Sequence, residues 1–226
     1  MDKILSDEII KCYDDAKNEV IEKLNGLLKS FGVLYPDYGF YIRGRIKELK
    51  RIEDKLKRKY KDKDSFDTQF VFENVTDIAG VRVIFAPIAT SYNMNLFDIT
   101  LRSLPIEAFE GLMKEAAREK KNNNIDIIYD FINQLASNGF KIIPSKTKDY
   151  ISKPKESGYM SYHVTVIASN GFPVEIQMRN FLQHVYAEAE HKRYEGDPKD
   201  EKVNSILEQC VSYLNSSSDV YDVHCL

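Results

Sequence analysis

Two acidic residues have surroundings that could place them in a site for a divalent cation. Asp77 precedes the apolar run 81–86, which we predict to be a buried strand, and Glu175 lies within a second predicted strand at 172–178. Magnesium in proteins is usually held by one or two carboxylates, and its other positions go to water and substrate phosphates. Taken alone, Asp77 fits a turn or cap residue, and Glu175 fits the exposed side of a strand. The pair therefore indicates a metal site only if phosphate-binding groups accompany it.

Basic residues are concentrated in two segments that could supply such groups. Residues 43–63 contain eleven Lys or Arg against four Asp or Glu, and residues 141–155 contain five Lys against one Asp. Because the net charge of the whole chain is −3, this concentration favours a focused anion site over a continuous face for a long polyanion. The alternative is a solvated helix face, which a lysine-rich run by itself suggests more readily.

The first basic segment begins with the sequence Gly-Arg-Ile-Lys. Gly44 would allow a ligand to approach the backbone closely, and Arg45 could stack on a base or bind phosphate. Lys47 and Lys55 are eight residues apart and would lie on the same side of a helix that follows. The chain contains no GxxxxGK[ST] phosphate loop, so this motif is weak in isolation.

A second group of candidate residues surrounds a loop that contains Pro and Gly. Lys148 and Lys155 lie close in the sequence to Tyr159, Tyr162 and His163. An exposed Tyr beside such a loop could stack on a nucleobase, which contributes roughly 1–3 kcal/mol. The alternative places both tyrosines in the core and makes His163 an ordinary strand residue. We accept that alternative for Tyr162, which alternates away from the loop that carries Tyr159.

Composition places the chain among ordinary globular proteins. Hydrophobic residues make up 43% and charged residues 30% of the 226 residues, which fits one sizeable domain with a small helical appendage. We find no bilayer-spanning apolar stretch and no apolar region of a signal peptide. Cys12, Cys210 and Cys225 have no metal-ligand spacing, so we expect free thiols in a reducing compartment and a cytoplasmic location.

Hydrophobic periodicity predicts an α/β (α+β) fold with a mixed, mostly antiparallel sheet of about five strands flanked by helices. Helices are expected at 3–31 (one or two), 48–60, 125–137, 180–194 and 200–214, and strands at 40–46, 81–86, 140–143, 161–168 and 172–178. Asn138-Gly139 is expected to end a helix with a left-handed cap, and Asn170-Gly171 to form a hairpin turn.

These motifs, in order, resemble the synthetase domain of the RelA/SpoT alarmone synthetases. The resemblance rests on GRIK, TDIAGVR, KDYISKPKESGYMSYH, VEIQMRN and AEHK. It implies a nucleotidyltransferase-like synthetase domain at 39–195 with an insertion at about 89–124, between an N-terminal helical segment at 1–38 and a C-terminal helical tail at 196–226. The length resembles that of stand-alone small synthetases, which lack hydrolase and regulatory domains.

The family transfers the β,γ-pyrophosphate of ATP to the 3′-hydroxyl of GTP or GDP, giving (p)ppGpp-type alarmones. For ATP, the resemblance implies that Arg45 and Arg82 sandwich the adenine and that Lys47 and Lys55 hold the phosphates. It also implies that Asp77 and Glu175 bind Mg²⁺ and that Glu175 helps to deprotonate the attacking hydroxyl. On the acceptor side it implies that Tyr159 stacks on the base, that Lys148, Lys155 and His163 serve phosphates or ribose, and that Gln177 and His184 lie close by.

Departures from the family pattern concern the acceptor more than the donor. Lys148 stands where small synthetases generally carry Arg, and Met160 replaces a basic residue common after the stacking Tyr. The chain after His191 is also shorter than in small synthetases that assemble as tetramers. A toxin of the same fold that pyrophosphorylates the 3′ end of tRNA, with a small antitoxin partner, therefore remains an alternative, as does an inactive nucleotide-binding regulator. The resemblance leaves homo-oligomer formation open.

Overall fold

The N-terminal part of the chain forms one long helix. In the computed structural model, which describes residues 5–61, 63, 65–87, 124–195, 201, 205 and 208, helix α1 runs without interruption from Asp7 to Leu34. The hydroxyl of Ser6 accepts a hydrogen bond from the backbone N–H of Ile9, which satisfies one free donor of the first turn. Its buried residues recur at helical spacing, so one face of α1 packs against the rest of the molecule.

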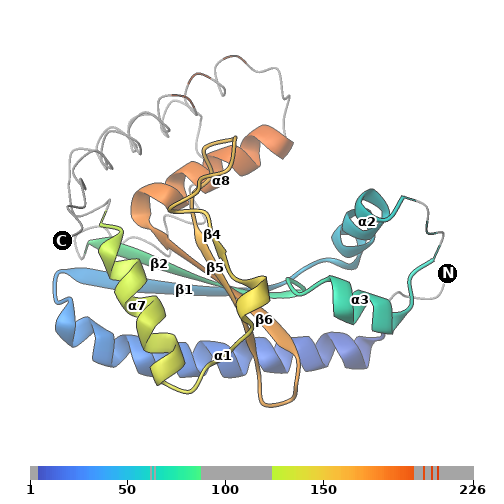
Figure 1. The fold of residues 1–226 in the computed structure, drawn as a ribbon, viewed down its shortest axis with the longest axis horizontal. Coiled ribbons are helices and arrows are strands. Elements are labelled where there is room, and N and C mark those ends of the chain that lie inside the picture. The colour runs from blue at the N-terminus through green and yellow to red at the C-terminus, as the bar shows by residue number, and fades with distance from the viewer. Residues whose placement is uncertain are drawn as a thin grey trace.

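A six-stranded mixed sheet forms the centre of the fold (Figure 1). Its strands are β1 (Tyr38–Ile46), β2 (Ala79–Pro87), β3 (Lys141–Ile142), β4 (Lys148–Asp149), β5 (Tyr162–Ile167) and β6 (Pro173–Asn180). The order is β1-β2-β6-β5-β3, and β4 also pairs with β5. Among the strand pairs of the described residues, only β2–β6 is parallel. The predicted mixed, mostly antiparallel sheet is confirmed.

Four shorter helices and one 3-10 turn complete the described part of the chain. These are α2 (Leu49–Lys59), α3 (Thr68–Asn74), α7 (Asp126–Ser137), α8 (Phe181–Glu195) and η2 (Pro144–Lys146). The sequence did not predict α3, which spans fewer than two turns. Its N-cap Asp67 accepts a hydrogen bond from the N–H of Phe70, and the ring of Phe70 packs against Tyr60 at the end of α2.

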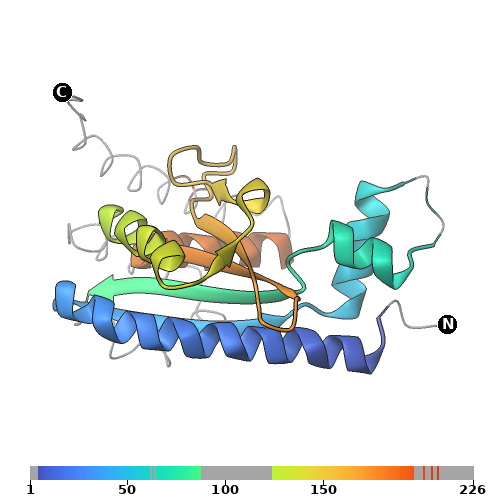
Figure 2. The same ribbon diagram turned by 60° about the horizontal axis from the view of Figure 1, so that its bottom comes forward.

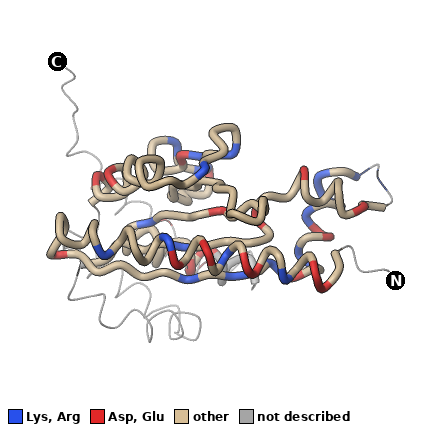
Figure 3. The backbone as a smooth tube through the Cα atoms, turned by 90° about the horizontal axis from the view of Figure 1, so that it is seen from below, with Lys and Arg blue, Asp and Glu red and all other residues tan. Residues whose placement is uncertain are grey.

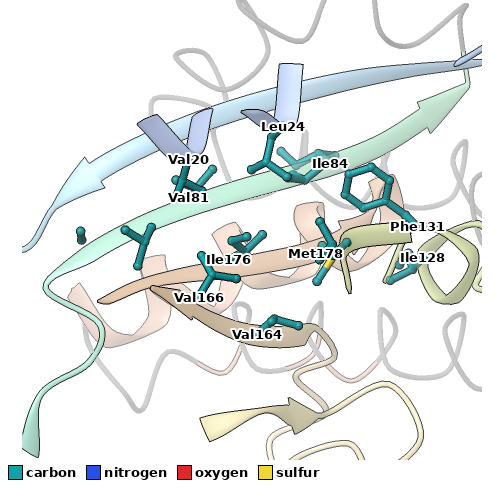
Figure 4. Packing of buried hydrophobic residues seen from close by; sticks show 14 of the residues in the cluster. Val20, Leu24, Val81, Ile84, Ile128, Phe131, Val164, Val166, Ile176 and Met178 are labelled. Atoms are coloured by element: carbon teal, nitrogen blue, oxygen red, sulfur yellow. The ribbon is translucent and has the colours of Figure 1, made fainter. Parts of the chain in front are cut away.

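The helices cover the two faces of the sheet unequally. On one face, the ring of Phe85 on β2 packs against Phe31 of α1 and Phe131 of α7, with ring centroids 6.4 and 5.4 Å away. Figure 2 shows α1 lying along the sheet, and Figure 4 shows apolar side chains from α1, α7 and the strands packed together. On the other face, Arg82 of β2 contacts Glu188 of α8. Successive strand residues point to opposite faces of the sheet. The face toward α1 and α7 therefore packs in the hydrophobic core, whereas the face toward α8 can carry polar side chains.

Glycine allows the two predicted chain reversals. Gly139 has φ +78°, and its N–H and that of Phe140 bond to the carbonyls of Ala136 and Leu135, which closes α7 with a Schellman motif. Gly171, with φ +86°, ends the short turn between β5 and β6. Both predictions are confirmed.

Some predictions fall on other parts of the chain. The insertion at 89–124 lies outside the described residues except at residue 124, and so does nearly all of the helix expected at 200–214. Cys12 is a free cysteine, whereas Cys210 and Cys225 also lie outside that part. Within the described residues, no helix combines the length and the apolar character that crossing a membrane requires.

Candidate active site

The face of the sheet toward α8 carries two rows of polar residues from neighbouring strands. Because paired residues on adjacent strands share a face, the strand register aligns Arg43, Arg82, Gln177, His163 and Lys148 in one row across β1, β2, β6, β5 and β4. The next row contains Arg45, Gly80, Glu175 and Thr165. Residues from distant parts of the sequence thus meet on one surface.

A cleft of about 410 Å³ opens on this surface. Of the predicted site residues, it is lined by Arg45, Lys47, Asp77, Arg82, Glu175 and Gln177. Two further arginines, Arg43 and Arg51, also line it. The sequence analysis placed neither in the nucleotide site, although both lie in the basic segment that continues into α2, where Figure 3 marks the basic residues. The cleft therefore combines several fixed cations with two candidate metal-binding carboxylates.

Gly44 lines the cleft and also has a packing role that was not predicted. The close approach between its backbone and a ligand stays a prediction. Gly44 pairs with Val81, so a side chain at this position would lie on the apolar side of β1. A Cβ added there would lie 2.7 Å from Cδ1 of Ile21 and 2.8 Å from Cδ of Lys17. The absence of a side chain lets α1 approach the sheet at this point. By contrast, Gly80 faces the cleft between Arg45 and Glu175.

Asp77 is the counter-ion of two lysines. Its carboxylate oxygens lie 2.5 Å from Nζ of Lys47 and 2.7 Å from Nζ of Lys55. Burial alone would raise the pKa of Asp77, but the two ammonium groups outweigh it and hold the pKa at about 2. Burial also lowers the pKa of Lys47, and the charge of Asp77 opposes that shift. Asp77 is therefore ionised at neutral pH and binds Lys47, which lines the cleft, and Lys55, which does not. We call this part the lysine end of the cleft.

Glu175 is held between hydrogen-bond donors on both of its oxygens. Nε2 of Gln177 donates to Oε2 at 2.7 Å, and Nδ1 of His163 lies 3.3 Å from Oε1. Burial would raise the pKa of Glu175, yet these partners lower it to about 2. Burial lowers the pKa of His163, so the imidazole is neutral at physiological pH. Glu175 is thus an ionised, fixed carboxylate on the floor of the cleft.

The two carboxylates suit a magnesium ion that also binds substrate phosphate. Both line the cleft and are ionised, and the charge of Asp77 acts on Glu175. No group of three or more His, Cys, Asp or Glu in the described ranges could hold a metal ion without help. That composition fits Mg²⁺, which needs one or two carboxylates, and does not fit an all-protein cage. The magnesium assignment remains a prediction.

Arg82 and Glu188, which both line the cleft, form a buried ion pair. Nη1 of Arg82 donates to Oε1 of Glu188 at 2.6 Å, and their side chains are 11% and 3% exposed. Burial lowers the pKa of Arg82 to about 10, whereas Arg82 and its neighbours hold that of Glu188 at about 2 against the effect of burial. The sequence did not single out Glu188. In the sequence, Glu188 stands between Ala187 and Ala189, which are both buried. A carboxylate between apolar residues of a helix is the feature that could have identified it.

We expect Glu188→Gln to lower the free energy of unfolding at pH 7 by roughly 3 kcal/mol, because it leaves the charge of Arg82 buried without its partner. A depressed carboxylate pKa stabilises the fold above the unfolded value of 4.5, and that contribution disappears as the pH falls through about 2. The difference between wild type and variant should therefore shrink at low pH. Urea unfolding at pH 7 and pH 3 would test this, with the exposed Glu22→Gln as control. An equal difference at both pH values would contradict it.

The candidate acceptor residues lie beside the cleft, in β4, β5 and the loop between them. Tyr159 is 8% exposed, more buried than expected for an open stacking platform, and Nζ of Lys155 lies 4.5 Å from the centre of its ring. Lys148 pairs with His163 across β4 and β5. Tyr162 lies on the apolar side, where its ring meets Tyr129 of α7 at 6.0 Å, as predicted. The structure therefore gathers Lys148, Lys155, Tyr159 and His163 in one place, and their roles stay predictions.

His184 differs from the other predicted acceptor residues. It is fully buried on α8, with Nδ1 4.0 Å from Oε1 of Glu188, and burial holds its pKa well below the ordinary value. It is not among the residues that line the cleft. The prediction that it lies close to the acceptor stays a prediction.

Comparison with known proteins shows which family the chain matches. Residues 44–199 match the family described as the region found in RelA / SpoT proteins. A probable chloroplastic GTP diphosphokinase of rice (Oryza sativa subsp. japonica) is 26% identical over 85% of the chain, and a guanosine-3′,5′-bis(diphosphate) 3′-pyrophosphohydrolase of Aquifex aeolicus is 43% identical over 37% of it. The chain spans 20% and 13% of the lengths of these two relatives.

Solved structures share the fold. The small alarmone synthetase 1 of Bacillus subtilis, bound to its product pppGpp, superposes with a TM-score of 0.59 at 20% identity, covering 96% of this chain and 97% of that one. The small alarmone synthetase 2 of the same organism gives a TM-score of 0.58 at 21% identity, covering 94% of each chain. The family match covers more than half of the sequence and includes the cleft residues of β1, β2 and β6 except Arg43. The chain belongs to the RelA/SpoT family.

Proposed function

We propose that this chain is a pyrophosphokinase that transfers the β,γ-pyrophosphate of ATP to the 3′-hydroxyl of GTP or GDP. The observation that supports this most directly is the cleft, which is lined by five cationic side chains and four carboxylates, among them the ionised Asp77 and Glu175, in a chain of this family. The matched rice protein is named a probable GTP diphosphokinase, and the Bacillus synthetase is described with its product pppGpp. Both facts support the choice of reaction.

ATP would enter with its phosphates at the lysine end of the cleft. The triphosphate carries about four negative charges that repel an incoming oxygen nucleophile, so several cations must offset them. Lys47 and Lys55 already hold an anionic group, the carboxylate of Asp77, and phosphate oxygens would join it. Arg45 and Arg82 lie on adjacent strands and line the same cleft, which suits a base held between two guanidinium groups.

The reaction forms a bond between the acceptor O3′ and the β-phosphorus, and it breaks the bond from that phosphorus to the oxygen shared with the α-phosphate. AMP leaves with this oxygen. A magnesium ion on Asp77 and Glu175 would supply charge neutralisation for the phosphates. A carboxylate with a pKa of about 2 is a weak base. Glu175 would therefore orient the hydroxyl and receive its proton late, as a loose phosphoryl-transfer state allows.

The acceptor would bind beside Glu175, on the side of the sheet formed by β5 and β4. His163 and Gln177 contact Glu175 directly, and Tyr159 reaches this group through His163. For Tyr159 to stack on a guanine, the side chain of Lys155 would leave the ring of Tyr159 and turn toward the acceptor phosphates. Lys155 is itself exposed, so this movement requires little reorganisation.

Incubation with γ-labelled ATP and GDP, GTP or deacylated tRNA would test the choice of acceptor. We expect label on GDP and GTP. Label on tRNA alone would overturn the guanine-nucleotide acceptor in favour of a tRNA-modifying toxin. No label on any acceptor, with ATP binding intact, would contradict transfer altogether and favour an inactive regulator.

A further inference from the structure

Five side chains, Glu175 among them, form a closed ring of polar contacts on β5, β6 and the loop before β5. From Glu175 one side of the ring runs to His163, whose Nε2 lies 3.0 Å from the hydroxyl of Tyr159. The other side runs to Gln177, whose Oε1 lies 3.2 Å from Nη2 of Arg179. Nη2 of Arg179 also donates to the hydroxyl of Tyr159. The ring thus closes at Arg179.

Arg179 is one of the most deeply buried polar residues, with 2% of its surface exposed. It lies on the same face of β6 as Glu175 and Gln177, because residues two apart in a strand point the same way. Its Nε donates to the hydroxyl of Ser161 at 3.3 Å, and that hydroxyl donates to the carbonyl of Met178. It is not among the residues that line the cleft.

The chemistry of the donors fixes the direction of every contact in the ring. A guanidinium group can only donate, so the oxygens of Tyr159 and Gln177 accept from Arg179. The amide of Gln177 then presents Nε2 to Glu175. A hydroxyl can accept two hydrogen bonds and donate one, so the contact between Tyr159 and His163 is decided at Glu175: Oε1 of this carboxylate can only accept, and Nδ1 of His163 carries the proton toward it. Nε2 of His163 then accepts from the hydroxyl of Tyr159. Two chains of donors therefore begin at Arg179 and converge on the two oxygens of Glu175.

We infer that Arg179 is a positioning residue that orients Tyr159, His163 and Gln177 so that both oxygens of Glu175 are held by donors, with His163 in the Nδ1–H tautomer. The link to catalysis rests on the proposed function, in which Glu175 orients the attacking hydroxyl. Chains of hydrogen bonds polarise one another in a buried site, so a change at Arg179 reaches Glu175 through both arms. The inference also connects the proposed base-stacking residue Tyr159 with the reacting end of the site.

Nitrogen-15 spectra of the four histidines in metal-free protein would test the arrangement without any turnover, with the His163 signals assigned by loss in His163→Gln. We expect the Nδ1–H tautomer in the wild type. The Nε2 resonance should move in Tyr159→Phe, which removes the donor to Nε2, and in Arg179→Lys, which keeps the charge but ends one bond short of the position of Nη2. Tyr162→Phe is the matched control, because its hydroxyl lies outside the ring. An Nε2–H tautomer in the wild type would overturn the inference.

Kinetics with the same variants would test the consequence for transfer. Tyr159→Phe should lower kcat by about tenfold, the effect of one net hydrogen bond, with little change in KM for the guanine nucleotide. Arg179→Lys should lower kcat further, because both arms lose their donor. If both variants kept the wild-type kcat, the positioning role would be wrong. If the spectra changed as expected but even the wild type transferred nothing, the hydrogen-bonded ring would stand and the proposed function would fail.

Discussion

Replacing Glu175 with Gln is expected to reduce pyrophosphate transfer by at least about 10³-fold while leaving the fold intact. The substitution keeps the shape of the side chain but removes a negative charge that would hold magnesium and orient the attacking hydroxyl. It also replaces one carboxylate oxygen by an NH2 group. Because Gln177 and His163 each donate toward an oxygen of Glu175, this NH2 group would face one of the two donors. The effect should appear in kcat, because the cations that would bind ATP are untouched.

Steady-state kinetics and urea unfolding of the same preparation would measure both parts of this expectation. Glu73→Gln is a matched control, since Glu73 is exposed on α3, outside the cleft. Near-normal transfer by Glu175→Gln would show that the assignment of Glu175 is wrong. Loss of activity together with loss of cooperative unfolding would show a structural role instead.

Asp77→Asn is expected to be nearly as damaging, for a different reason. The amide would remove a proposed metal ligand and leave Lys47 and Lys55 without their counter-ion. Both lysines would remain free to bind phosphate, so KM for ATP should change little while kcat falls by at least about 10²-fold. Because the weakened group is a metal ligand, the variant should need more Mg²⁺ than the wild type for its residual activity.

A magnesium titration of transfer by wild type and variant would check this prediction. Asp67→Asn is a suitable control, because Asn is also a good N-cap for α3 and Asp67 is not among the residues that line the cleft. Equal magnesium dependence in Asp77→Asn and wild type would exclude Asp77 as a ligand. A large rise in KM for ATP would show instead that Asp77 mainly positions the lysines.

The main elements of the fold could be predicted because their periodicity is strong. Helix α1 and strands β2, β5 and β6 all lie close to their predicted ranges. The alternation in residues 174–180 also predicts that Arg179 lies on the same face as Glu175 and Gln177. Its burial could not be predicted in this way, because a single Arg near the end of a strand suggests an exposed side chain.

What the sequence could not show depends on long-range packing. The purpose of Gly44 becomes visible only when α1 lies across β1. Tyr159 is contacted by Arg179, which is twenty residues later in the sequence, and by Lys155, which is four residues earlier. Nor does local sequence pair Arg82 with Glu188, more than a hundred residues away. Such contacts decide the ionisation and orientation of the site residues, and spacing along the chain does not encode them.

The most direct test of pyrophosphate transfer follows the two terminal phosphates of ATP separately. ATP labelled at the β-phosphorus and ATP labelled at the γ-phosphorus would each be incubated with protein, Mg²⁺ and GDP, and the release of AMP measured alongside. We predict that both labels reach the same 3′-modified guanine nucleotide in equal amounts, with one AMP released for each product. Transfer of the γ-label alone with release of ADP would contradict pyrophosphate transfer, because it would show a simple phosphate kinase.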